Sequence, residues 1–329
     1  ALQAGFPASR MYFHGNNKTA ADIRYAIDNG VGYFIVDNDR ELHDIDAYAA
    51  EVGIQQNILV RITPGIDPHT FAAVNTGKID CQFGIPLATG QALPFIGEVL
   101  KKEHVHLRGF HCHIGSQMTS GMPIIEATDK IISLYKKLLA EGIKVDHIDM
   151  GGGLGVTYDN ETPPTPSEYC APILERLKDL DVSIYIEPGR AMVANACILL
   201  AKVQYQKDNG DKHFIITDTG MNDMIRPALY GSWMTIINTT VHPDGETVKS
   251  DVVGPICESD DFLGKDRKLN VRNGDILAVR GAGAYGSSMA STYNTRRLPC
   301  EVMVDGDKSY VIKKRQSYED IWKDEIILG

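Results

Sequence analysis

Hydrophobic and polar residues alternate in blocks along the first 190 residues of the chain. A short apolar run is followed by a polar or glycine-rich cluster and then by about a dozen residues of helical period. Six such units are visible, and their apolar runs with polar endings span residues 11–17, 33–38, 58–65, 107–115, 145–153 and 183–189. The pattern predicts parallel strands joined by helices. Among the helices, residues 19–30 have Thr19 to cap the start and Gly30 the end, and another closes on Gly142.

Polar residues follow the apolar core of all six runs, which favours a (β/α)8 TIM-type barrel over residues 1–196. An open doubly wound sheet would also bind ligands at the carboxyl ends of its strands, but mainly near its switch point. A barrel has eight units of about 30 residues, and six units are visible here. We therefore expect two further units, or roughly 60 residues, before Ala1, so that residues 1–196 form a partial barrel.

The pattern changes after residue 196. Alternating segments separated by Gly-containing turns span residues 197–208, 212–220, 247–255, 275–281 and 300–315. They predict a C-terminal antiparallel β domain over residues 197–329. Residues 317–326 are acidic and amphipathic and predict a short closing helix.

Composition narrows the possible partners. The formal net charge is -10 with no block of Lys and Arg, which argues against nucleic acid. No apolar run approaches the roughly 20 residues of a membrane helix. The six cysteines are scattered singly, without zinc-site spacing, and this fits a reducing cytoplasm.

Three clusters of the predicted barrel could carry chemistry. The sequence DMGGGLG, residues 149–155, offers backbone N–H groups for a phosphate, although a tight strand-to-helix turn explains it as well. In HCHIGSQ, residues 111–117, two histidines suggest a metal, but no third ligand stands nearby, so no metal site is predicted. His113 instead suits stacking on a flat ring, with the Ser116 hydroxyl reaching a phosphate.

The third cluster is EPGR, residues 187–190, at the end of the sixth run. Glu187 and Arg190 could form a surface ion pair of little value. At a strand end, a carboxylate could instead keep a proton on a heteroaromatic nitrogen, as pyridoxal-phosphate enzymes require. A phosphate cradle, a stacking histidine and a partner for a ring nitrogen then converge on pyridoxal 5'-phosphate.

The β domain has further candidates, each of which is more often structural when taken alone: Arg226, Tyr230, Cys257, Glu258 and Tyr285. Together with the barrel clusters they resemble the fold-type III pyridoxal-phosphate decarboxylases across essentially the whole chain. FHGNNK, HCHIGSQ, DMGGGLG, EPGR, MIRPALY, GPICESDD, GAGAYG and YNTRRLP occur in the order of that family. The β-domain motifs are similar to the diaminopimelate branch rather than to the ornithine or arginine branches.

The resemblance implies roles for particular residues. His113 would stack on the cofactor ring, Glu187 would face its nitrogen, and Tyr285 would contact both cofactor and substrate. The other cofactor contacts would be Ser116, Gly151, Gly152, Gly153, Pro188, Gly189 and Arg190. Arg190 and Arg226 would bind substrate carboxylates, with Tyr230 nearby.

The same resemblance implies that Glu258 reads the distal amino group of diaminopimelate. Cys257 would supply a proton after carbon dioxide leaves, and would reach the site from the partner subunit of a homodimer. The expected reaction is the conversion of meso-diaminopimelate to L-lysine and carbon dioxide.

One departure from the family is plain. Its Schiff-base lysine stands in an early Lys-Ala-Asn motif, which this sequence lacks, and Lys18 lies at a later strand end. The expected upstream units would hold that lysine. Two alternatives stay open: a decarboxylase of ornithine, arginine or lysine on the same scaffold, or a noncatalytic cofactor-binding relative.

Overall fold

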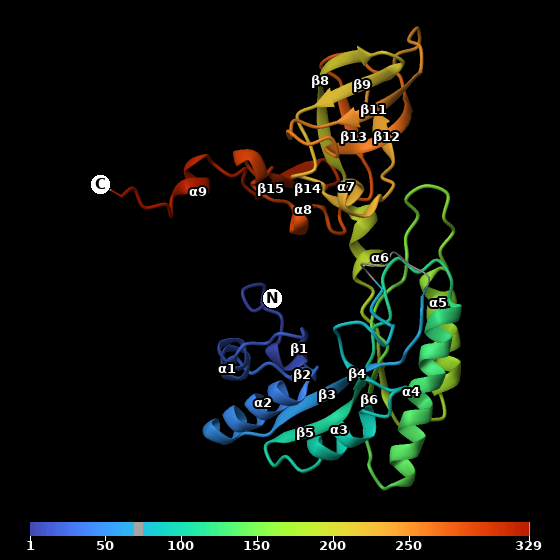
Figure 1. The fold of residues 1–329 in the computed structure, drawn as a ribbon, viewed down its shortest axis with the longest axis vertical. Helices are drawn as coiled ribbons and strands as arrows, with labels where there is room; N and C mark the ends of the chain where they lie inside the picture. Colours follow the sequence, from blue (N-terminus) through green and yellow to red (C-terminus); the bar gives the residue numbers. More distant parts are fainter. Residues whose placement is uncertain (69–74, 329) are drawn as a thin grey trace. The chain divides into compact units, whose positions relative to one another are not determined.

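The computed structural model describes residues 1–68 and 75–328 and contains two compact units (Figure 1). Unit 1 comprises Ala1–Gly155 and Thr162–Gly189. Unit 2 comprises Val156–Glu161 and Arg190–Gly329. Each unit is described by itself.

Unit 1 is built on a curved parallel sheet. Its strands pair in the order β1 (Tyr12–Phe13), β2 (Tyr33–Val36), β3 (Gln56–Thr63), β5 (Val105–His111), β6 (His147–Asp149) and β7 (Ser183–Tyr185). All five pairs are parallel. Each of the six predicted runs overlaps one of these strands, which confirms the barrel-type prediction. The additional strand β4 (Ile85–Pro86) pairs with β3, and its two residues are too few to show a pattern.

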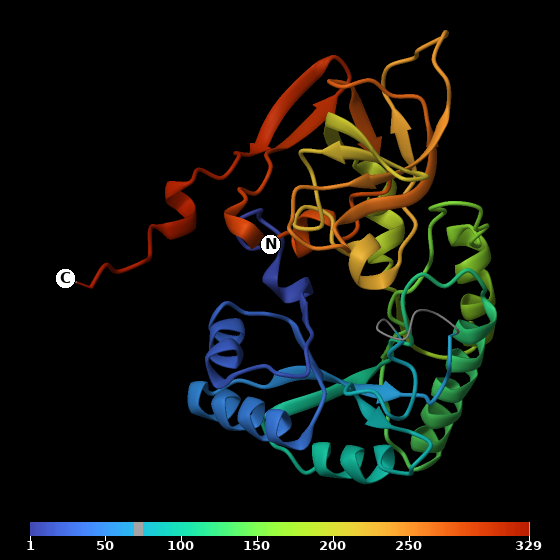
Figure 2. The ribbon, with the colours of Figure 1, turned by 45° about the horizontal axis from the view of Figure 1, so that its top comes forward.

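Helices follow the strands along the chain and lie outside the sheet (Figure 2). They are α1 (Ala20–Asp28), α2 (Asp39–Val52), α3 (Ala92–Val99), α4 (Met122–Ala140) and α5 (Pro166–Leu177). Thr19 and Asp22 form the capping box that starts α1. Gly142, at φ +82°, follows the end of α4, a backbone conformation that favours glycine. The predicted start of α1 at Thr19 and the predicted end of α4 at Gly142 are therefore confirmed.

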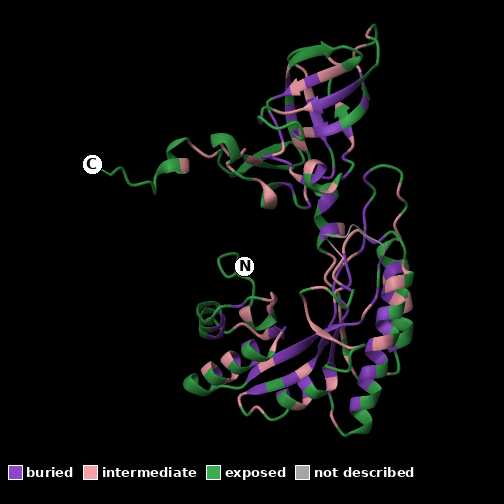
Figure 3. Cartoon of the chain, in the orientation of Figure 1, coloured by how far each residue is buried: buried purple, intermediate pink, exposed green. Residues whose placement is uncertain are grey.

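The core of unit 1 lies between the sheet and these helices (Figure 3). Phe34, Ile35 and Val36 of β2 are at most 1% exposed, as are Ile58 and Leu59 of β3. Successive residues point to opposite faces of a strand, so both faces of the sheet are covered. The strand ends are thereby fixed in a rigid frame.

Unit 2 holds a six-stranded sheet in the order β10 (Ile236–Asn238), β13 (Ile276–Val279), β8 (Leu199–Asn209), β9 (Lys212–Thr217), β11 (Val248–Val253) and β12 (Phe262–Leu269). Four pairs are antiparallel, as predicted, and β9 with β11 is parallel. The long connection over residues 218–247 allows that pair to run in the same direction. Val203, Ile215, Val252 and Leu277 are fully buried in the core of the unit.

Smaller elements complete unit 2. A separate hairpin joins β14 (Glu301–Asp305) to β15 (Lys308–Lys313). The short helices are α6 (Gly189–Val193), which begins at the end of unit 1, α7 (Arg226–Tyr230), α8 (Gly286–Met289) and α9 (Glu319–Trp322), with α9 in the predicted closing segment. Single 3-10 turns are η1 (Ala8–Arg10) in unit 1 and η3 (Ala194–Ala196) and η4 (Tyr293–Thr295) in unit 2. Within the described ranges, no helix has the length and apolar character needed to span a bilayer.

Candidate active site

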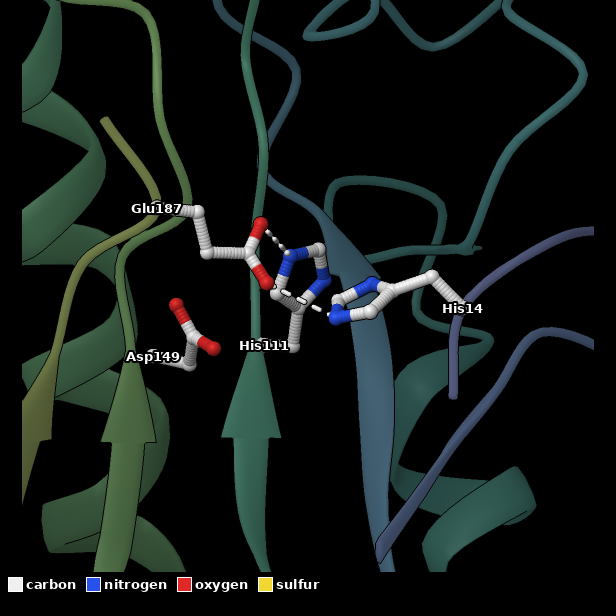
Figure 4. Close-up of side chains that lie close together, drawn as sticks. All are labelled: His14, His111, Asp149 and Glu187. Carbon is white, nitrogen blue, oxygen red and sulfur yellow. Dashed lines mark ion pairs between the residues drawn. The ribbon is translucent and has the colours of Figure 1, made fainter. Parts of the chain in front are cut away.

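Four ionisable side chains meet at the carboxyl ends of the unit 1 strands (Figure 4). His14 follows β1, His111 ends β5, Asp149 ends β6 and Glu187 follows β7. Glu187 lies between the histidines: its Oε1 is 2.7 Å from His14 Nε2, and its Oε2 is 3.4 Å from His111 Nε2. Parallel strands bring these distant parts of the sequence together, since all their carboxyl ends share one edge.

Burial sets the charges of this cluster. His111 is 1% exposed, and burial lowers its pKa to about 4, so the ring is neutral near pH 7. Burial alone would raise the pKa of Glu187, but the neighbouring His111 and His14 lower it well below its usual range. Burial, followed by the nearby Glu187 charge, raises the pKa of Asp149 to about 7. Glu187 is therefore the anion of the cluster.

The cluster has capacity for a ligand. Neither ring nitrogen of His111 makes a well-aligned hydrogen bond, although the side chain is buried, and such groups normally have a partner. The Glu187 side chain is about one-third exposed, so it is partly open to a ligand. Two imidazoles and two carboxylates, with ligand atoms within 4.8 Å of one another, are also a donor set that suits a divalent transition metal. The sequence suggested a metal ligand at His111 but offered no third ligand nearby, because His14, Asp149 and Glu187 lie far from His111 in sequence.

The glycine loop after β6 packs against its neighbours at distances that only glycine allows. A Cβ on Gly152 would lie 2.1 Å from the Glu187 carbonyl oxygen, and one on Gly151 would lie 2.4 Å from that of Cys112. The Gly151 amide donates to Asp149 Oδ1 and the Gly152 amide to His113 Nδ1. No helix begins here, because α5 starts only at Pro166, so neither the expected helix start at a phosphate loop nor the alternative of a tight strand-to-helix turn is found. The close packing fixes the loop against the ends of β5 and β7, and the Gly151 and Gly152 amides already have acceptors within the protein.

His113 stands beside this loop. Its Nδ1 accepts the Gly152 amide at 3.1 Å, which leaves the protonated nitrogen on the other side of the ring. Burial lowers the pKa of His113 to about 4, so it presents a neutral flat ring. Ser116 is half-buried, three residues further on. A neutral imidazole fixed by one nitrogen suits stacking on another ring.

Lys18 has a structural setting. Its ammonium donates to Glu41 at 2.8 Å and to the carbonyl oxygens of Gly15 and Ile35 at 2.7 Å each. These three acceptors use all three protons of the ammonium group. The side chains of Lys18 and Glu41 are 1% and 3% exposed. Lys18 is therefore engaged in a buried ion pair, as suits a structural lysine.

In unit 2, two buried arginines share one tyrosine. Arg190 Nη1 donates to the Tyr158 hydroxyl at 2.7 Å, and the Arg226 guanidinium lies 5.9 Å from the centre of the same ring. Arg190 also lies 5.1 Å from the Tyr285 ring, and Arg226 lies 5.4 Å from that of Tyr230. Arg226 is 4% exposed, and residues 1–68 and 75–328 contain no carboxylate in ion-pair contact with it. Tyr158, which joins the two arginines, was not predicted, because a lone Tyr in a loop carries no signal.

Cys257 and Glu258 lie next to each other on an exposed segment of unit 2. Asn294 Nδ2 lies 3.2 Å from Cys257 Sγ, and the Tyr293 hydroxyl donates to Glu258. Neither Tyr293 nor Asn294 was assigned from the sequence. Cys257 and Glu258, both singled out from the sequence, are thus each contacted by one residue of the adjacent pair Tyr293 and Asn294.

Comparison with known proteins gives a consistent answer. Residues 1–194 match the model of the pyridoxal-dependent decarboxylase, pyridoxal binding domain. The diaminopimelate decarboxylase of Haemophilus influenzae is 44% identical over 98% of this chain and 77% of that protein. The crystal structure of the Helicobacter pylori enzyme with L-lysine is 39% identical, with a TM-score of 0.93 over 98% of this chain and 80% of that one.

A lysine/ornithine decarboxylase from Vibrio vulnificus, solved with putrescine, is more distant. It is 26% identical, with a TM-score of 0.76 over 90% of this chain and 76% of that one. Each of these three proteins matches at least 90% of this chain. The chain belongs to the diaminopimelate decarboxylases, within the pyridoxal-dependent decarboxylase family.

Proposed function

We propose that the protein removes carbon dioxide from meso-diaminopimelate and releases L-lysine, using pyridoxal 5'-phosphate. The observation that carries the proposal is the anionic Glu187, held beside the neutral His111 at the carboxyl ends of the parallel strands. A carboxylate with a strongly lowered pKa is the partner that a protonated pyridine nitrogen needs. The 44% identity to a diaminopimelate decarboxylase supports the choice of substrate.

The residues of unit 1 fit the cofactor. The buried His111 nitrogens without aligned partners and the glycine loop with no space for Cβ atoms are both features of a ligand site. When bound, the cofactor supplies an electron sink for the bond to the departing carboxylate. Glu187 would keep the ring nitrogen protonated and His113 would cover the ring face. Further contacts would come from Ser116, Gly151, Gly152, Gly153, Pro188, Gly189, Arg190 and Tyr285.

The residues of unit 2 fit an amino acid with two carboxylates. Arg190 and Arg226 would bind these groups, with Tyr230 and Tyr285 beside them, because guanidinium forks match carboxylates in shape and charge. Glu258 would bind the distal amino group. Cys257 would deliver a proton to the carbon that has lost carbon dioxide, which leaves its sulfur as a thiolate.

We also propose that the working form is a cytoplasmic homodimer. Both faces of the β14–β15 hairpin expose large apolar side chains, including Val304 at 71%, Val311 at 63% and Ile312 at 60%. An isolated two-stranded hairpin is marginally stable, so a second copy of the chain would cover it. All six cysteines are free thiols, which suits a reducing compartment.

The test is the release of carbon dioxide and lysine by the holoenzyme. Meso-diaminopimelate should be turned over, while ornithine and arginine should give little product. Glu187→Gln should lower turnover at least about 100-fold, because the amide cannot hold the ring proton. Turnover of ornithine or arginine without turnover of diaminopimelate would refute the substrate assignment.

Cys257→Ala separates chemistry from binding. The variant should retain its cofactor, as judged by visible absorption, and lose about 100-fold or more in kcat, since general acids contribute on that scale. The matched control is Cys300→Ala, another exposed thiol of unit 2. Equal turnover by the Cys257 and Cys300 variants would remove Cys257 from the mechanism.

A further inference from the structure

Two adjacent residues of η4 hold the two adjacent residues of the Cys257 segment. Tyr293 donates its hydroxyl proton to Glu258, and the Asn294 amide lies 3.2 Å from Cys257 Sγ. Each residue of one pair therefore contacts one residue of the other, and we call these four residues the clamp. Tyr293 and Asn294 also line a cavity of about 580 Å³ with Met221, Asn222 and Ile225. The clamp therefore stands at an accessible site.

The backbone of η4 is built to present the Asn294 side chain. Asn294 has φ 54° and ψ 33°, and Thr295 follows with φ 56°. Among residues other than glycine, Asn adopts this left-handed conformation at the lowest cost. Consecutive left-handed residues are strained and are found at functional sites that the surrounding structure supports. The Ser291 amide donates a hydrogen bond to the Asn222 carbonyl oxygen at 2.9 Å, and this contact anchors the turn.

The opposite half of the clamp is equally fixed. Asp261, which is 3% exposed, accepts the amides of Ile256 at 2.5 Å and Met221 at 2.6 Å. A Cβ on Gly254 would lie 2.6 Å from this carboxylate, so the segment packs tightly just before Cys257. An exposed thiol is thus carried on a rigid loop. Its position is determined by unit 2 alone.

We propose that Asn294 is a positioning residue for Cys257: its amide N–H donates to the sulfur, orients the thiol, and stabilises the thiolate left after proton delivery. The inference rests on the proposed role of Cys257. During that step the S–H bond breaks and a C–H bond forms, and the electron pair of the S–H bond stays on sulfur. A donor aimed at sulfur is worth more as this charge develops.

The other charged or titratable groups around the thiol act in a different way. Glu258 is its neighbour on the same segment, and Tyr293 faces it from η4. Asp260 and Asp261 follow on that segment, and Asp261 is held by the Ile256 and Met221 amides, while Arg296, the nearby cation, donates to the Asp218 carbonyl oxygen. For Glu258 and Tyr293 the charge follows from their chemistry. Both become negative on losing a proton, so neither stabilises a thiolate. Asn294 is the neutral donor of the clamp and keeps its proton at every pH of interest.

The test is the alkylation of Cys257 in the holoenzyme by iodoacetamide across pH, followed by mass spectrometry of the Cys257 peptide. Asn294→Gly keeps the left-handed backbone and removes the donor. The midpoint of its alkylation profile should move up by about half to one pH unit, and kcat should fall about threefold to tenfold with KM little changed. Asn294→Asp, which replaces the donor by an anion, should move the midpoint further in the same direction.

Cys197 and Cys300 are exposed thiols and serve as internal controls in the same digest. A wild-type profile and wild-type kcat in Asn294→Gly would overturn the proposal. A defect in Asn294→Ala together with wild-type behaviour in Asn294→Gly would also overturn it. The Asn294 side chain would then matter only through the backbone conformation that it favours. If Cys257→Ala keeps full turnover while Asn294→Gly still shifts the profile, the contact is real and the proton-donor role of Cys257 fails.

Discussion

At the scale of single residues, the site depends on a buried histidine that stays neutral. A protonated His111 would neutralise Glu187 and compete with a ring nitrogen for the same carboxylate. Burial prevents this, because it costs more to charge an imidazole away from water. The resulting arrangement places a neutral imidazole beside the Glu187 anion.

This arrangement predicts a pH-dependent stability. The pKa of His111 is about 4 in the folded protein, against 6.5 for a free imidazole in the unfolded chain. The contribution of His111 to the free energy of unfolding is therefore present above pH 6.5 and is lost as the pH falls toward 4. Relative to His111→Gln, the cofactor-free wild type should lose about 2 kcal/mol of unfolding free energy between pH 7.5 and pH 5. Urea unfolding at the two pH values measures the difference.

The control is His106→Gln on the same strand, since the His106 side chain is exposed and unfolding changes its surroundings little. The difference in unfolding free energy between His106→Gln and the wild type should be the same at both pH values. A His111→Gln difference that does not change with pH would show that burial of His111 is not what keeps it neutral.

The glycine loop predicts a second residue-scale effect. Gly152→Ala would place a Cβ 2.1 Å from the Glu187 carbonyl, so the ends of β6 and β7 must separate. We expect a loss of about 1–3 kcal/mol in stability and a lower occupancy by the cofactor. Gly97→Ala in α3, where a Cβ meets nothing within 4 Å, should not destabilise the protein. Full cofactor occupancy in Gly152→Ala would contradict the close packing of this loop.

Sequence reasoning reached part of this site. Glu187, Arg190 and the glycines were visible because they follow apolar runs, and strand ends are where barrel sites form. His14 and His111 were not assigned, because their meaning comes from Glu187, which lies far away in sequence. Tyr158 and Asn294 were missed for the same reason: a tertiary contact gives them their roles, and no local pattern records it.

At the scale of elements, the Lys18–Glu41 pair ties the end of β1 to α2. Removing one partner of a buried ion pair leaves the other charge uncompensated. Lys18→Met should therefore cost about 3–5 kcal/mol, and Lys18→Met with Glu41→Leu should recover most of that loss. Chemical unfolding of the three proteins measures both effects.

The same lysine gives a chemical control. Borohydride reduction of the holoenzyme should attach the cofactor to a lysine other than Lys18, because its three protons already have acceptors. Lys101→Met in the exposed pair with Glu98 should leave stability almost unchanged. Recovery of the label on Lys18 would reverse its structural assignment.

Elements were predicted better than contacts. Runs such as residues 33–38 and 58–65 gave β2 and β3, since strands buried on both faces are continuously apolar. β12 has the sequence FLGKDRKL, whose charged residues hide the alternation, and it was not predicted. The parallel pairing of β9 with β11 was also missed, because strand direction depends on the path of residues 218–247 and not on either strand.

At the scale of the whole molecule, assembly is the remaining question. The hairpin pairs Val302 with Val311 and Met303 with Tyr310, and neighbouring pairs point to opposite faces. All four side chains are at least 45% exposed, so neither face of the hairpin has a core to pack on. A second copy of the chain would bury these side chains and remove an exposed edge.

Val311→Asp should therefore convert the dimer to a monomer in sedimentation velocity, because a desolvated carboxylate without a partner is costly in an apolar interface. Asn209→Asp, at an exposed polar side chain at the end of β8 and away from the hairpin, adds the same charge and is the matched control. Activity should fall in parallel with dissociation in the Val311 variant, and higher protein concentration should restore part of it by mass action. A wild type that sediments as a monomer, or a Val311→Asp variant that remains dimeric and active, would place the subunit interface elsewhere.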